Sequence, residues 1–232
     1  MIYLRSASER GISNLGWLES KHSFSFGHYY DPEHMGFSVL RVINDDTVAP
    51  GSGFDTHGHQ DMEIISYVLE GAIEHRDSMG NHFVIPAGDI QRLSAGTGIT
   101  HSEFNHSGRD VLKFLQIWIE PSVAGIKPDY EQKTIVQTEL MTPIITPNGV
   151  GDSMKINQDV SVYRVVLNGG EELTSNTYER SGYLHVIDGE GELSDAHLSS
   201  GDGVGLMNED LKFEAIDQPL TALWFDLPAI ED

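Results

Sequence analysis

Residues 51–71 read GSGFDTHGHQDMEIISYVLEG, and residues 99–104 read ITHSEF. Two pairs of potential metal ligands lie in these segments: His57 with His59, and His101 with Glu103. The members of each pair are two residues apart, so on a β-strand their side chains point to the same face. Two such pairs on facing strands could surround one ion with three imidazoles and a carboxylate. That donor set suits a divalent transition metal, with positions left open for a substrate.

The residues between the pairs indicate how the strands are joined. Gly71 follows the apolar segment 63–69, and the glycine-rich segment 95–98 stands just before His101. A turn at 95–98 lets one strand return beside another. The spacing leaves Glu63 as a rival for the carboxylate ligand, because it follows His59 by four residues. Turn-forming residues lie between these two, so the alternation of faces cannot be carried from one to the other.

The positions of Gly51, His57, His59 and Glu63 resemble the first motif of the cupin superfamily, and the segment PAG at 86–88 resembles the start of the second. The longer runs HGHQDMEIISYVLEGAIEHRDSMGN and PAGDIQRLSAGTGITHSE resemble the pirin family within the cupins. The resemblance is strongest to the bacterial pirin-like proteins with quercetin 2,3-dioxygenase activity. It covers nearly the whole N-terminal half and is much looser in the C-terminal half.

The resemblance also implies a ligand set. Many cupins place a histidine three residues after the glycine of the second motif, but Gln91 stands there in this chain. The pirin pattern places the remaining ligands later, at His101 and Glu103. The implied metal ligands are therefore His57, His59, His101 and Glu103, and the implied role of Glu63 is supporting or structural. Three residues are candidates to hydrogen-bond the ligands: Glu63, Asp61 and Gln116.

Composition excludes some classes of partner and site. The chain of 232 residues has 14 basic and 36 acidic residues, for a formal net charge of −22. This charge disfavours binding to nucleic acid and to anionic membrane surfaces. The absence of cysteine excludes disulfides and thiolate ligands. The first residues lack the pattern of a signal peptide, and no apolar run of about 18 residues predicts a membrane span. We therefore expect a cytoplasmic protein.

Short apolar segments separated by Gly, Asn, Asp and Pro predict an all-β fold. Together with the resemblance, they predict a two-barrel (bicupin) architecture of antiparallel β-sandwich or jelly-roll barrels. We expect a metal-binding barrel at 1–125, a proline-rich connecting segment at 126–148, and a degenerate barrel at 149–232. The second barrel has no His-x-His pair, and His185 and His197 stand alone in it. We therefore predict that it carries no metal.

The alternation of apolar residues predicts individual strands. The segment HSFSF at 22–26 alternates strictly, and the segment 36–43 reads as a strand that ends in a turn at 44–46. The loop between them is rich in aromatic residues and histidines, including His28 and His34, and is a candidate wall of the site together with Phe24 and Phe26. Further strands are predicted at 63–69, 72–76, 82–85, 89–93, 111–119, 160–167, 183–187, 204–207 and 222–226.

The resemblance implies a metal-dependent dioxygenase that opens the ring of a flavonol such as quercetin with O₂ and releases carbon monoxide. Iron is the first choice of metal, and Cu, Ni, Mn or Zn also fit the donor set. Glu103 has a second candidate role, as a general base for the substrate hydroxyl. The alternative is a non-enzymatic metal-binding regulator that acts through a protein partner. A cupin isomerase ranks third, because no basic cluster for phosphate lies near the ligands.

Overall fold

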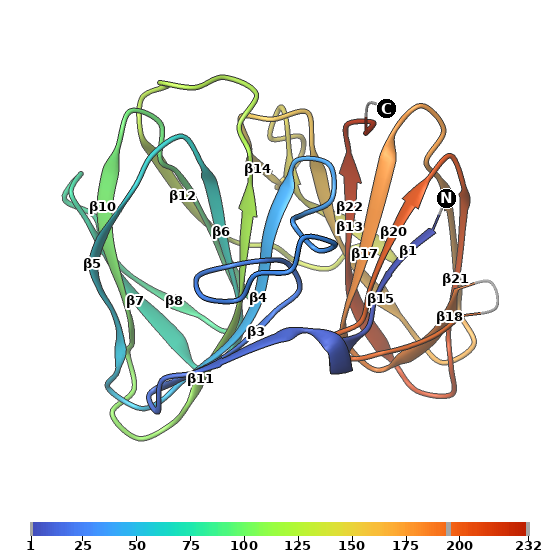
Figure 1. Cartoon of the computed structure of the whole chain (residues 1–232), viewed down its shortest axis with the longest axis horizontal. Helices are drawn as coiled ribbons and strands as arrows, with labels where there is room; N and C mark the ends of the chain where they lie inside the picture. Colours follow the sequence, from blue (N-terminus) through green and yellow to red (C-terminus); the bar gives the residue numbers. More distant parts are fainter. Residues whose placement is uncertain (1, 194–195, 231–232) are drawn as a thin grey trace.

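The alternating segments form two antiparallel β-barrels that lie side by side (Figure 1). The computed structural model describes residues 2–193 and 196–230. Within these residues the chain forms 22 strands and one short 3₁₀ helix, η1 (Ala7–Glu9). The strands are β1 (Ile2–Arg5), β2 (Gly11–Asn14), β3 (Leu18–His22), β4 (Leu40–Val48), β5 (Gly53–His59), β6 (Glu63–Glu70), β7 (Ala72–Asp77), β8 (His82–Pro86), β9 (Asp89–Ser94), β10 (Ile99–Asn105), β11 (Leu112–Ile119), β12 (Asp129–Thr134), β13 (Met141–Thr146), β14 (Met154–Lys155), β15 (Ser161–Leu167), β16 (Glu172–Asn176), β17 (Ser181–Asp188), β18 (Glu190–Leu193), β19 (Ala196–Ser199), β20 (Gly203–Met207), β21 (Asp210–Ala215) and β22 (Leu220–Leu227).

Each barrel combines a seven-stranded and a four-stranded sheet. In the first barrel the strand orders are β12-β9-β6-β11-β4-β3-β2 and β5-β10-β7-β8. In the second they are β1-β20-β17-β22-β15-β13-β14 and β16-β21-β18-β19. The pairings are antiparallel, apart from the parallel pair of β13 and β14. The predicted all-β, two-barrel fold is confirmed.

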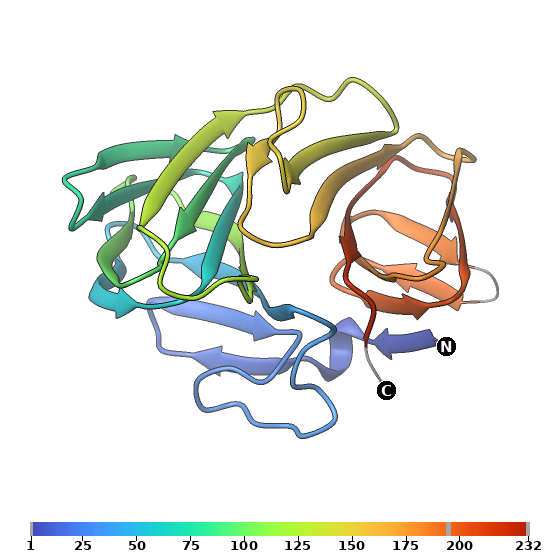
Figure 2. The same cartoon turned by 90° about the horizontal axis from the view of Figure 1, so that it is seen from above.

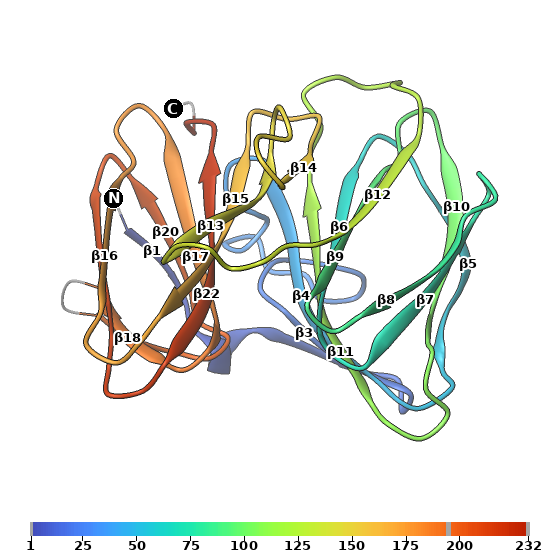
Figure 3. The same cartoon turned by 180° about the vertical axis from the view of Figure 1, so that it is seen from behind.

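Two segments cross between the barrels. The first strand, β1, pairs with β20 of the second barrel, whereas β2 and β3 belong to the first (Figure 2). The segment expected to connect the barrels contributes one strand to each. β12 pairs with β9 of the first barrel, and β13 pairs with β15 of the second (Figure 3).

Two strand predictions near the N-terminus were wrong. The segment 22–26 is not a strand, because β3 ends at His22. The predicted turn at 44–46 lies instead in the middle of β4. Asn44 and Asp46 are turn-forming residues by preference, but here they point into the barrel, and Asp45 between them points outward and lies 3.5 Å from Arg10. Tertiary environment therefore overrides local preference on this strand.

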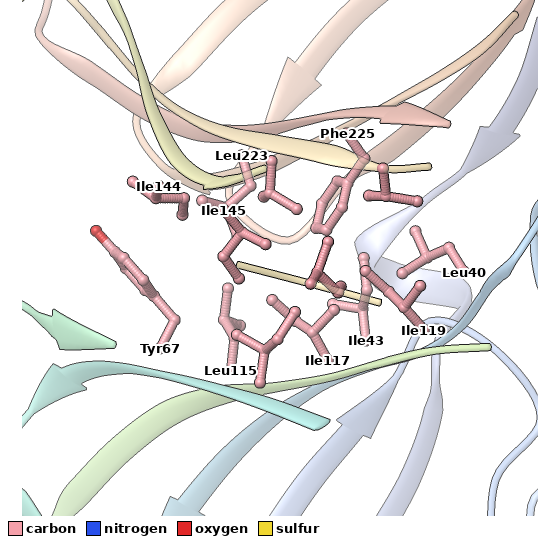
Figure 4. Close-up of a cluster of buried hydrophobic side chains, with 14 of the residues drawn as sticks. Leu40, Ile43, Tyr67, Leu115, Ile117, Ile119, Ile144, Ile145, Leu223 and Phe225 are labelled. Atoms are coloured by element: carbon pink, nitrogen blue, oxygen red, sulfur yellow. The ribbon is translucent and has the colours of Figure 1, made fainter. Parts of the chain in front are cut away.

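The largest apolar core lies between the two barrels (Figure 4). It joins Leu115 and Ile117 of β11 to Leu223 and Phe225 of β22. Successive side chains of a strand point to opposite faces, so the other face of β11 points into the first barrel. The second barrel thus supports the strands that carry the first barrel's interior. Over the described part of the chain, no helix is long and apolar enough to cross a membrane.

Candidate functional site

The interior of the first barrel is built in three layers. Along β6, the inward-facing residues Ile64, Ser66 and Val68 follow one another at every second position. Ile64 belongs to one apolar cluster and Val68 to another, with the polar Ser66 between them. β11 repeats this order with Trp118, Gln116 and Phe114. A polar layer therefore lies between two apolar layers.

Strand pairing brings the predicted ligands into the polar layer. β10 lies between β5 and β7, and on it His101 is paired with His57 of β5. Glu103 is paired on the other side with His75 of β7. β5 carries an irregularity near Phe54, where its register with β10 shifts. The two sequence pairs are thus on neighbouring strands of one sheet.

Three of the predicted ligands form one compact group. The ligand atoms of His57, His59 and His101 all lie within 4.8 Å of one another. Their ring centroids are 4.6 to 4.9 Å apart. Glu103 belongs to a second group of the same size, with His101 and His75. The structure therefore brings the four predicted residues to one place, and adds His75, which the sequence analysis missed.

The three histidines of the first group can bind a metal ion at neutral pH. The ring Nδ1 of His57 lies 2.7 Å from the carbonyl oxygen of Asp55; it donates there, which leaves Nε2 as a free acceptor. Burial, together with the neighbouring rings of His101 and His57, lowers the pKa of His59 to about 4. Burial also lowers the pKa of His101. Both rings are therefore neutral at pH 7, the form in which histidine binds metals.

His101 shows that the group fits a metal ion. Its side chain is only 1 % exposed, and neither ring nitrogen has a hydrogen-bond partner within the described residues. A buried ring nitrogen without a partner is costly, so such atoms call for an unseen partner such as an ion or water. Two further imidazoles face it. A divalent transition metal satisfies this donor set, with His57, His59 and His101 as its nitrogen ligands.

Glu103 is held by amides from the facing sheet. Oε1 accepts hydrogen bonds from Ser66 at 3.0 Å and from the side-chain amide of Gln91, and Oε2 accepts one from Gln116 at 3.1 Å. Ser66, Gln91 and Gln116 are paired in one row across β9, β6 and β11. Each carboxylate oxygen has about two lone pairs, so among the described residues Oε2 keeps one without a hydrogen-bond partner. That lone pair is available to a metal ion or a proton.

Two aromatic residues fix the amides in turn. The Tyr130 hydroxyl donates to Oε1 of Gln91 at 3.1 Å, and the Trp118 indole donates to Oε1 of Gln116 at 3.2 Å. Both amides therefore present their NH₂ groups to the carboxylate. Gln91 stands where many cupins have a ligand histidine, and here it orients a ligand candidate instead.

The other candidate supporting residues lie elsewhere. Glu63 accepts hydrogen bonds from Ser94 at 2.9 Å and from Asn157 of the second barrel at 3.1 Å, so it joins the barrels and belongs to neither ligand group. Asp61 accepts one from the backbone of Gly125. Its φ of 46° breaks the strand, which explains why the faces of His59 and Glu63 are not in phase. Among the three candidates, Gln116 contacts a predicted ligand.

The aromatic loop contributes less than expected. Phe24 is buried between the barrels, where its ring lies 5.6 Å from that of Tyr183. Phe26 meets Trp118 edge-on at 5.3 Å, and Trp118 meets His59 edge-on at 5.0 Å. His28 is exposed, and His34 pairs with the Tyr3 hydroxyl at 2.6 Å. Only Phe26 therefore approaches the site.

A shallow depression of about 460 Å³ opens beside His59. It is lined by Gly58, His59, Gln60, Ser78, Gly98, Ile99 and Thr100. Through this depression, solvent reaches the side chain of His59. Its lining has no aromatic ring other than His59, which meets Trp118 edge-on.

Asp46 is a buried carboxyl group in the same barrel. Burial raises its pKa from 3.8 to about 7, against a hydrogen bond from Ser20. When folding raises the pKa of a carboxyl group, the stability that the group contributes is fully present at a pH below its pKa in the unfolded chain. That contribution is lost as the pH rises through the pKa in the folded protein, here about 7. In metal-free protein, we expect Asp46→Asn to increase the free energy of unfolding more at pH 8 than at pH 5, by at most roughly 3 kcal/mol. Urea denaturation at both pH values measures this. The exposed Asp152→Asn should give the same small change at both, and an equal effect of the two variants would contradict the prediction.

Comparisons with known proteins place the chain in a family. The pirin family model matches residues 5–119, and a model described as the quercetinase C-terminal cupin domain matches residues 143–227. A quercetin 2,3-dioxygenase of Escherichia coli K12 is 45 % identical over 231 residues, which cover 99 % of this chain and 100 % of the relative. The chain belongs to the pirin family of the cupin superfamily. A putative quercetin 2,3-dioxygenase of Pasteurella multocida is 41 % identical, over 98 % of this chain and 100 % of the relative.

Solved structures agree over the whole length. The crystal structure of YhhW from Escherichia coli has a TM-score of 0.96 and 45 % identity, and covers all of both chains. A crystal structure of the bacterial pirin YhhW in complex with nickel(II) has a TM-score of 0.95 and 45 % identity, and covers 99 % of this chain and all of YhhW. The similarity extends through the second barrel.

The two histidines predicted to stand alone lie in the second barrel, where His185 is buried on β17 and His197 is exposed near Glu190.

Proposed function

We propose that this protein is a metal-dependent dioxygenase that opens the ring of a flavonol such as quercetin with O₂ and releases carbon monoxide. The observation that carries the proposal is the group of three imidazoles, in which the ring nitrogens of buried His101 have no hydrogen-bond partner among the described residues. The full-length similarity to proteins named quercetin 2,3-dioxygenase supports the substrate class. His57, His59, His101 and Glu103 are the proposed metal ligands.

A metal held there supplies a Lewis acid for the flavonol oxygens. Residues of the chain position the flavonol and its hydroxyl proton. Trp118 and Phe26 form the aromatic wall behind His59 and offer a surface for a planar ring. Glu103 has one free lone pair on Oε2, so it either binds the metal or accepts the substrate's hydroxyl proton at that atom. We assign it ligation first, and proton transfer as a second role that requires release of the metal bond.

Iron(II) is the proposed metal, and nickel(II) is the next choice because a similar protein has been crystallised with it. Copper, manganese and zinc also fit imidazole and carboxylate ligands. Affinity generally increases from iron to copper along the first-row series, so the metal bound in the cell depends on availability. Activity measured with each metal in turn shows which of them supports the reaction.

The alternative is a non-enzymatic metal-binding regulator that acts through a protein partner. The depression beside His59 favours it, because that opening is shallow and its lining is mostly backbone and small polar residues. Enzyme pockets for small molecules usually enclose most of the ligand. The alternative predicts metal binding without turnover.

Oxygen consumption with quercetin tests the proposal. Metal-free protein is loaded separately with Fe(II), Cu(II), Ni(II) and Mn(II), and carbon monoxide is measured beside O₂. We expect turnover with at least one metal, and its loss in His59→Ala and Glu103→Ala. His197→Ala, an exposed histidine of the second barrel, is the matched control and should keep full activity. Stoichiometric metal binding without turnover for any metal would support the regulator instead.

A further inference from the structure

His75 lies at the centre of the first barrel, outside the predicted ligand set. It is on β7, directly paired with Glu103 of β10, and its side chain is fully buried. Its Nε2 lies 3.1 Å from Oδ2 of Asp77, to which it donates. Its Nδ1 has no partner within the described residues. The ring lies 5.4 Å from that of His101 and 4.7 Å from that of Tyr130.

Asp77 is fixed in place, so it holds the His75 ring in one orientation. Its Oδ1 accepts the backbone N–H groups of Met79 at 2.9 Å and Asn81 at 3.1 Å. Its Oδ2 accepts the side-chain amide of Asn81 at 2.8 Å, and its side chain has no exposed surface. Histidines that bind metals usually donate their second ring nitrogen to a carboxylate or a carbonyl. Among the four histidines of the two ligand groups, His75 has this carboxylate partner.

The side chains of His75, His101 and Glu103 form a possible donor set. The ligand atoms of His75, His101 and Glu103 lie within 4.8 Å of one another, and all three residues are buried. Metal–ligand bonds of about 2.1 Å place two ligand atoms up to about 4.2 Å apart, so a contraction of roughly half an ångström closes the group on an ion. Two histidines and one carboxylate with open positions are the donor set of many non-haem iron(II) oxygenases.

We propose that His75, His101 and Glu103 form an inner metal-binding position, beside the outer position formed by His57, His59, His101 and Glu103. The two positions share His101 and Glu103, so His75 distinguishes the inner one; within the described residues, both ring nitrogens of His101 are without a hydrogen-bond partner. The inner position takes a divalent first-row metal such as Fe(II) or Ni(II). This inference rests on the proposed metal binding of the cluster, and it adds His75 as a ligand.

Removing the outer histidines isolates the inner position. The variant His57→Ala/His59→Ala is compared with the same variant carrying His75→Ala in addition. Metal-free proteins are titrated with NiCl₂ by calorimetry at pH 7.5, and bound nickel is counted after gel filtration. We expect the double variant to keep one nickel per chain with a 10- to 1,000-fold weaker affinity than the wild type, and the triple variant to keep none. X-ray absorption of the double variant should show two imidazole ligands.

The outcomes separate this inference from the proposed function. If the wild type binds nickel but the double variant binds none, or if His75→Ala changes nothing in that background, the inner position is wrong and the outer one stands. If the wild type binds no metal, the proposed function itself fails. Circular dichroism and thermal unfolding check that each variant folds. If the double variant does not fold, His59→Ala with and without His75→Ala makes the same comparison, because the added loss of His75 should weaken nickel binding further.

Discussion

Replacing His101 by alanine is expected to remove metal binding and turnover together. His101 belongs to both groups of ligand atoms, is buried, and has no other partner for its nitrogens within the described residues. Loss of a residue that only orients a ligand costs about 10- to 100-fold in metal affinity. Loss of a ligand common to both groups should therefore cost well over 100-fold. Nickel titration and oxygen consumption with quercetin measure the two effects.

Thermal unfolding gives a second readout for His101→Ala. A metal that binds only the folded state raises the unfolding temperature of the wild type, and this rise should vanish in the variant. His185→Ala is the matched control, because His185 is equally buried, is also on a central strand, and its Nδ1 also has no hydrogen-bond partner in the described part of the chain. It should lower the stability of the protein but keep the rise on adding nickel. Stoichiometric nickel binding by His101→Ala would overturn both metal positions.

The sequence alone was enough to propose the two ligand pairs, because each pair is local. His57 with His59, and His101 with Glu103, are each two residues apart, so one strand is enough to place each pair on one face. Which pairs meet depends on strand register, and that came from the family resemblance. His75 was missed because it is a lone histidine in the sequence. The spacing of His75 and Asp77 was its one signal, since residues two apart on a strand share a face.

The fold was predictable where residues close together in the sequence determine a strand. It was not predictable where strands far apart in the sequence pair with one another. The strands from 63 to 119 lie close to their predicted bounds, with glycine turns between them. The pairing of β1 with β20 joins residues about two hundred positions apart, and no local pattern indicates it. The turn predicted at 44–46 was wrong because Asn44 and Asp46 belong to the polar interior of the barrel. They are paired with Gln116 and Phe114 of β11 and are buried, so their polarity does not indicate a turn.

The largest effect on stability is expected at the interface of the barrels, for Phe225→Ala. Phe225 is fully buried in the core between the barrels, 6.3 Å from the ring of Tyr183. Truncating a buried phenylalanine to alanine costs about 3–5 kcal/mol, through lost burial and the cavity left behind. That is a large part of the stability of a typical protein. Urea denaturation should show the loss, whereas Phe83→Ala should cost clearly less, because Phe83 is 43 % exposed.

The same variant tests whether the second barrel supports the site. Phe225 packs in the cluster that contains Leu115 and Ile117, and these alternate on β11 with Gln116 and Trp118. A cavity there loosens the strand that holds Glu103 through Gln116. We therefore expect Phe225→Ala to weaken nickel binding by several-fold in protein that is still folded, although no residue of the cluster around Phe225 is a ligand candidate. Unchanged affinity together with the full loss of stability would show that the site is independent of the interface.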